Sequence, residues 1–93
     1  MNGKMEQDLI KLIEHTLFDK INKNEDFIRY SFYELRVKYN LTEYETEKFL
    51  ELLRNRLFYL EYKTYMLGDR YYYNNKEKVV EDNELLIAIK VKK

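Results

Sequence analysis

The chain has 93 residues, 45% of them apolar and 37% charged, which suffices for one buried core and leaves no room for two domains. Its 17 basic and 17 acidic residues cancel, so no global positive charge draws it to nucleic acid or to an anionic membrane surface. It has no cysteine and one histidine, which excludes disulfides, thiolate metal sites and cysteine nucleophiles.

The first predicted element is an amphipathic helix at about residues 5–22. Apolar residues recur there at intervals of three and four, as they do on the buried stripe of a helix. They are Met5, Leu9, Ile10, Leu12, Ile13, Leu17, Phe18 and Ile21. The polar residues 22–26 end this helix, and residues 27–30 (FIRY) have the composition of a short edge strand.

Two successive helix starts then show the same capping pattern. Ser31 and Glu34 fit the S-x-x-E capping box, in which the hydroxyl and the carboxylate each accept a hydrogen bond from a backbone N–H of the first turn. Thr42 and Glu45 repeat this pattern. The sequence therefore predicts two helices that begin close together.

A tight turn separates these two helices, because Asn40 can adopt the left-handed conformation that commonly ends a helix. We expect the second helix at about residues 31–39, the turn at 40–41 and the third helix at about 42–56. This arrangement is a helix-turn-helix. The predicted inward stripe of the third helix consists of Thr46, Phe49, Leu50, Leu53 and Leu57.

A β-hairpin is predicted next, at about residues 57–74. The segment is rich in β-forming residues that alternate in strand rhythm. Gly68 and Asp69 interrupt it as a glycine-first turn, so the hairpin is expected to have its tip near Gly68.

The C-terminal residues 76–93 fit either of two elements. Leu85–Val91 (LLIAIKV) is apolar and rich in β-branched residues, which favours a strand. Asn75 is also a suitable N-cap for a helix that runs from Lys76 through Val79, Val80, Asn83, Leu86 and Ile87. We favour the strand.

The order helix, strand, helix-turn-helix and hairpin resembles the layout of winged-helix domains. Residues 34–42 read E-L-R-V-K-Y-N-L-T and are similar to the E-L-A-x-x-L-G-L-S of many such domains. Residues 49–60 resemble the end of the family's recognition helix and its first wing strand. The resemblance covers about residues 5–74 and implies an α+β fold, in which a three-helix helix-turn-helix core precedes an antiparallel wing, with residues 1–93 as a single domain.

The same resemblance implies a small transcriptional regulator that binds double-stranded DNA as a homodimer. The second helix of such a motif lies in the major groove, and basic residues around it contact phosphates. The expected major-groove residues are Thr42, Tyr44, Glu47 and Lys48. The expected phosphate contacts are Ser31, Lys38, Lys63 and Arg70.

The charge of the third helix favours an alternative function. Residues 42–51 contain four glutamates and one lysine, a net charge of −3, and carboxylates that face phosphates weaken DNA binding. An acidic helix suits a basic protein partner instead. The alternative is therefore a winged-helix protein–protein interaction module with little affinity for DNA.

Tyrosine is frequent, with ten residues in the chain, and six of them lie between residues 59 and 73. Three interpretations stay open for these rings. They form a homodimer surface, they pack against one another across strands, or they stack on bases.

Nothing in the sequence indicates catalysis, a metal or another cofactor. His15 has no second histidine or cysteine as a partner, and the acidic pair Glu25 and Asp26 has no nucleophile nearby. The N-terminal residues lack the apolar segment of a secretory signal, and the longest aliphatic run, Leu85–Ile89, is far shorter than the ~20 residues that cross a bilayer. We therefore expect a cytoplasmic, non-enzymatic protein that does not associate with membranes.

Overall fold

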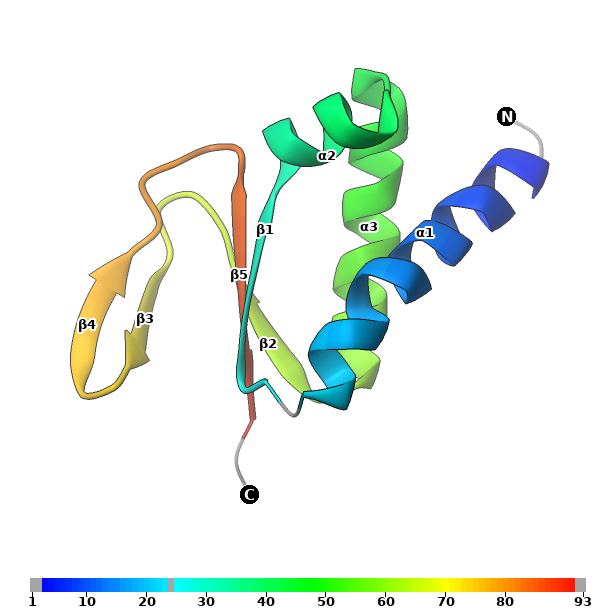
Figure 1. The fold of residues 1–93 in the computed structure, drawn as a ribbon. Coiled ribbons are helices and arrows are strands. Elements are labelled where there is room, and N and C mark those ends of the chain that lie inside the picture. The colour runs from blue at the N-terminus through cyan, green and yellow to red at the C-terminus, as the bar shows by residue number, and fades with distance from the viewer. Residues whose placement is uncertain (1–2, 24, 92–93) are drawn as a thin grey trace.

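The structure is a computed structural model that describes residues 3–23 and 25–91. It is an α+β fold in which three helices lie on one side of a three-stranded antiparallel sheet and a two-stranded hairpin lies on the other (Figure 1). The elements are α1 (Gly3–Asn22), β1 (Phe27–Ser31), α2 (Phe32–Tyr39), α3 (Glu43–Tyr59), β2 (Tyr62–Tyr65), β3 (Arg70–Tyr73), β4 (Lys76–Val79) and β5 (Leu85–Lys90).

The three predicted helices are confirmed, and so is the capping box of α3, whereas at α2 the structure shows the hydroxyl half of the predicted box. At α2, the Ser31 Oγ accepts from the backbone N–H of Glu34 at 3.3 Å, and Asn40 ends the helix with a left-handed φ of 54°. At α3 the full capping box forms, because Thr42 Oγ1 accepts from the Glu45 N–H at 3.1 Å and Glu45 Oε1 accepts from the Thr42 N–H at 2.9 Å. These contacts fix where both helices begin.

The third helix extends beyond its predicted end at residue 56 and continues to Tyr59. Leu57 is fully buried and continues the inward stripe, so residues 57–59 belong to α3 and not to the predicted wing. The chain leaves the helix at Glu61, whose positive φ of 68° is incompatible with continued helix.

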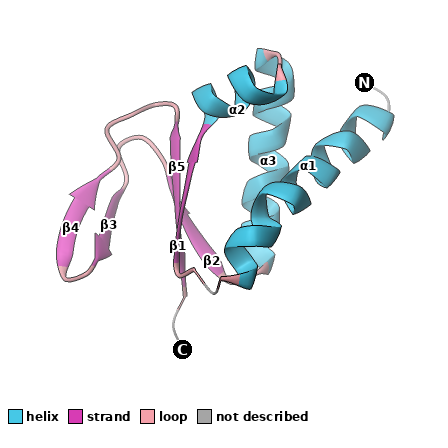
Figure 2. Ribbon diagram, viewed as in Figure 1, coloured by secondary structure: helices cyan, strands magenta, loops and turns pink. Residues whose placement is uncertain are grey.

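The C-terminal segment forms the central strand of the larger sheet, whose order is β1–β5–β2 (Figure 2). The preferred strand interpretation is thus confirmed and the helix alternative is wrong. Leu86 and Ala88 face the helical core, whereas Ile87, which is buried as well, points to the opposite face. Because both faces of β5 are covered, this strand is almost entirely apolar.

The predicted hairpin over residues 57–74 is wrong. β2 pairs with β5, and β3 pairs instead with β4. The hairpin tip is at Asn74 and Asn75, whose φ values of 54° and 62° are those of a two-residue primed turn. Gly68 does lie in a turn, with a φ of 88°, but this turn leads the chain out of the sheet and into the separate hairpin.

The hairpin packs on the face of the larger sheet that the helices leave open. The Tyr73 ring lies 4.7 Å from that of Phe27, and the Tyr71 ring lies 5.5 Å from that of Tyr65. Tyr72, between them, points to solvent. Packing between layers therefore accounts for Tyr65, Tyr71 and Tyr73, while a role in dimers or base stacking stays a prediction for the exposed rings.

The hydrophobic core lies between the helices and the inner face of the larger sheet. The predicted stripe of α3 is confirmed, because four of its five residues are buried and Leu50 packs against them. The predicted stripe of α1 is confirmed only in part, since Ile10 and Phe18 are exposed. The side chains of Met5 and Ile21 lie outside the described residues. The other core residues are Leu9, Ile13, Leu17, Ile28, Tyr30, Phe32, Leu35, Tyr62, Leu86 and Ala88.

Candidate nucleic-acid interface

The four residues expected in the major groove lie together at the start of α3. Thr42 is its N-cap, and Tyr44 and Glu47 are exposed on its first two turns. Lys48 is half-buried, with its Nζ 3.8 Å from Glu51 Oε2. This end of α3 therefore presents a tyrosine, a glutamate and a lysine that is partly neutralised by its neighbour.

The four glutamates of this helix have different environments. The carboxylate of Glu45 is turned back to the helix N-terminus by the capping box, and that of Glu51 lies beside Lys48. Glu43 and Glu47 line a cavity of about 300 Å³ between α2, α3 and the loop before β5. The negative charge is therefore concentrated on one side of α3 instead of being spread along it.

We call this 300 Å³ cavity the acidic cavity. It is lined by Phe32, Arg36, Glu43, Thr46, Glu47, Leu50, Met66, Asn83 and Glu84. The guanidinium Nη2 of Arg36 donates to Glu84 Oε1 at 2.6 Å, and this bond raises the pKa of Arg36. Since Arg36 is neutralised by Glu84, the carboxylates of Glu43 and Glu47 set the charge of the cavity.

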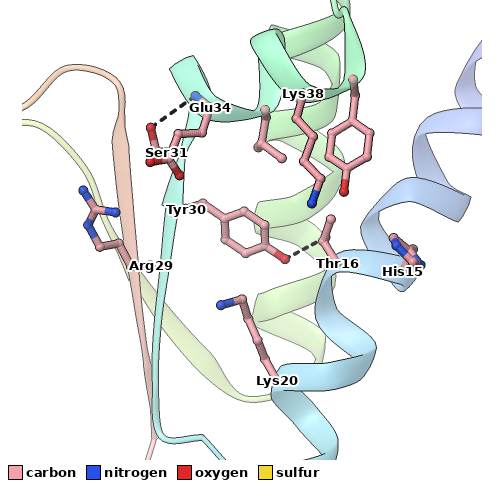
Figure 3. Close-up of a pocket in the computed structure, with 10 residues that line it drawn as sticks. His15, Thr16, Lys20, Arg29, Tyr30, Ser31, Glu34 and Lys38 are labelled. Atoms are coloured by element: carbon pink, nitrogen blue, oxygen red, sulfur yellow. Dashed lines mark hydrogen bonds between the residues drawn. The ribbon is translucent and has the colours of Figure 1, made fainter.

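A second cavity, of about 340 Å³, lies between α1, β1 and a different face of α2, and we call it the basic cavity (Figure 3). It is lined by His15, Thr16, Lys20, Arg29, Tyr30, Ser31, Glu34, Leu35, Lys38 and Tyr39. Ser31 and Lys38, two of the expected phosphate contacts, are among these residues. No local sequence pattern links them to Lys20 and His15, because residues of α1 and α2 come to line one cavity only in the folded chain.

A hydrogen bond between two hydroxyl groups forms the floor of the basic cavity. Thr16 Oγ1 and the Tyr30 hydroxyl are 2.8 Å apart, and the single proton of Thr16 is donated to the Ile13 carbonyl at 3.0 Å. Tyr30 is therefore the donor to Thr16. Burial raises the pKa of Tyr30 to about 12, so its proton stays in place at neutral pH.

The remaining two expected phosphate contacts lie on the strands. Lys63 is exposed on β2, with its ammonium 5.6 Å above the Tyr65 ring. Arg70 is exposed on β3, and its Nη1 lies 3.9 Å from Glu77 Oε1. The eight expected residues thus fall into three groups: the start of α3, the basic cavity, and two separate strands.

We compared the chain with models of protein families, with curated proteins and with solved structures, and none of them matches it. Over residues 3–23 and 25–91, no helix combines the length and apolar character needed to traverse a bilayer.

Proposed function

We propose that this protein is a winged-helix transcriptional regulator that binds duplex DNA, with the first turns of α3 in the major groove. The observation that carries the proposal is the exposed start of α3 within a capped helix-turn-helix. The inward stripe of this helix is anchored in the core, so its outer residues are held in a fixed orientation. The second helix of such a motif is the one that reads base edges.

The order of the elements supports the same proposal. A helix and a short strand precede α2 and α3, and strands and a hairpin follow, as the resemblance to winged-helix domains implies. On this proposal Tyr44, Glu47 and Lys48 meet base edges, and Lys38, Lys63 and Arg70 contact phosphates.

Fluorescence anisotropy with random-sequence duplex DNA at 50 and 200 mM salt tests this function. If about 4–8 phosphates are neutralised, the logarithm of affinity falls with the logarithm of salt concentration with a slope of about −4 to −7. The double variant Lys48→Ala and Arg70→Ala should bind more weakly and with a shallower slope. Lys11→Ala, on the exposed face of α1, is the matched control. Unchanged affinity in the double variant, or no binding at either salt concentration, contradicts the proposal.

The acidic cavity favours a second candidate, a protein–protein interaction module. Glu43 and Glu47 face a concave surface in which the one arginine is already paired, and this suits a basic peptide. Titration with a short oligolysine peptide tests it. The wild type should bind and Glu47→Lys should not, whereas equal binding by both proteins removes this candidate.

We further propose that the protein forms homodimers, which place two copies of α3 in successive major grooves. Several large aromatic side chains face solvent in the single chain, and the two most exposed, Phe58 and Tyr59 at 81% and 77%, are adjacent at the end of α3. Such side chains are common at association surfaces. Sedimentation equilibrium should give twice the mass of one chain for the wild type and a lower mass for Phe58→Ser, whereas the mass of one chain for the wild type contradicts the homodimer.

A further inference from the structure

The basic cavity contains two lysines that approach from different elements. Lys20 is in the last turn of α1, and Lys38 is in the last turn of α2. Figure 3 shows both side chains extending into the same cavity, on opposite sides of the hydrogen bond between Tyr30 and Thr16, with His15 at its edge. Two ammonium groups thus face the same open cavity.

Among the side chains that the structure describes, which do not include that of Asp19, no carboxylate forms an ion pair with Lys20 or Lys38. The Lys38 Nζ lies 5.4 Å from the centroid of the Tyr39 ring instead. Glu34 is the single carboxylate of the lining, and in Figure 3 it lies beside Ser31, away from both ammonium groups. The positive charges of Lys20 and Lys38 repel each other across the cavity, and an anion bound between them offsets that repulsion.

The two hydroxyl groups at the floor of the cavity are already hydrogen-bonded to protein groups. The Tyr30 proton is committed to Thr16, so the phenol is not available as a donor and the ammonium groups supply the hydrogen bonds. A volume of about 340 Å³ accommodates a phosphate group with a small substituent.

We propose that the basic cavity binds a small ligand that carries a phosphate group, with Lys20 and Lys38 holding the phosphate oxygens. The cavity has no lining residue from α3. The ligand therefore lies apart from the base-reading residues at the start of α3, whereas Lys38 is shared with the proposed DNA phosphate contacts, so the test below is made without DNA. Because α2 lines the cavity and is joined to α3 by the Asn40 turn, the ligand also contacts the helix that positions α3.

His15 makes this proposal directly measurable, because it is the only histidine of the chain and lines the cavity. We would titrate the protein with inorganic phosphate and then with pyrophosphate at constant ionic strength, and record the His15 ring-proton NMR signals. We expect both signals to move with saturation. Lys20→Gln and Lys38→Gln should each weaken binding about tenfold, as expected for the loss of a hydrogen bond to a charged group. Lys11→Gln, also on α1 but outside the cavity, should bind as the wild type does.

Three results would overturn the proposal. The first is a linear, non-saturating change that chloride reproduces at equal ionic strength. The second is unchanged phosphate affinity in both lysine variants, with circular dichroism confirming that all variants are folded. The third is movement of the His15 signals with a short DNA duplex but not with phosphate or pyrophosphate, which would assign the lysines to the DNA backbone.

Discussion

The two cavities that flank α2 have opposite charge although the chain as a whole is neutral. The basic cavity holds Lys20 and Lys38, which form no ion pair with any carboxylate whose side chain the structure describes, whereas the acidic cavity holds Glu43 and Glu47 beside the Arg36–Glu84 ion pair. A net charge of zero therefore conceals two local fields of opposite sign. The partners proposed above therefore follow from the local separation of charge and not from its sum.

Residues of the same hydrophobic core lie beneath both cavities, and we expect the largest loss of stability when a central residue of this core is truncated. Phe49 is fully buried, its ring lies 6.4 Å from that of Tyr30 under the basic cavity, and its helical neighbours Thr46 and Leu50 line the acidic cavity. We expect Phe49→Ala to lower the free energy of unfolding by about 3–5 kcal/mol, because a large cavity is left in the core. Urea unfolding followed by circular dichroism measures it.

Phe58→Ala is the matched control for that substitution. The Phe58 ring is on the same helix but faces solvent in the single chain, so at a concentration at which the protein is monomeric its removal should change the free energy of unfolding by less than about 0.5 kcal/mol. Equal losses in the two variants would show that the core is not centred on Phe49.

A second prediction concerns the stability of the protein at alkaline pH, which depends on Tyr30, a residue that lines the basic cavity and not the acidic cavity. The pKa of Tyr30 is raised to about 12 by burial, against 10.0 for an exposed tyrosine. Above pH 10 the unfolded chain therefore releases this proton before the folded protein does, and stability falls as pH rises toward 12. The loss that Tyr30 contributes is about 1 kcal/mol at pH 11 and about 2 kcal/mol at pH 12.

Tyr30→Phe should remove this part of the alkaline loss, at a cost of about 1 kcal/mol at neutral pH for the missing hydrogen bond to Thr16. Tyr72→Phe, at an exposed ring, should leave the profile of the wild type unchanged. Parallel stability profiles of the wild type and Tyr30→Phe between pH 9 and 11.5 would mean that the Tyr30 hydroxyl is accessible to solvent.

The helix-turn-helix could be predicted from sequence because its determinants are local. Thr42 and Glu45 cap the same turn, and Asn40 ends a helix by its own backbone conformation. The strand pairing could not be predicted in this way, since β2 pairs with residues 87–90 across an intervening hairpin. At Asn74–Asn75, two adjacent residues that tolerate positive φ did indicate the turn, but Asn75 also fits a helix N-cap.

The two cavities could not be predicted from local sequence patterns, because residues from elements far apart in the sequence line each of them. Lys38 was identified as a candidate contact from its place in the motif, but its association with Lys20 depends on how α1 packs against β1 and α2. Likewise, Glu84 reaches Arg36 from 48 residues further along the chain. The charge pattern of one helix does not give the charge of its surroundings in the folded protein, because side chains from other elements, such as Glu84 beside Arg36, also lie there.

The smallest expected effects are the changes in stability when one charged side chain of either cavity is neutralised. They test the contrast between the two cavities directly, because the change should be an increase for the basic cavity and a decrease for the acidic cavity. In phosphate-free buffer at low salt, Lys20→Gln or Lys38→Gln removes one of two facing like charges and should raise stability by a few tenths of a kcal/mol. Arg36→Gln removes the partner of Glu84 and leaves its carboxylate beside Glu43 and Glu47, so it should lower the melting temperature. Added salt should reduce both changes because it screens the charges. If all three variants shift the melting temperature in the same direction, the basic and acidic cavities do not differ in how their charges are compensated.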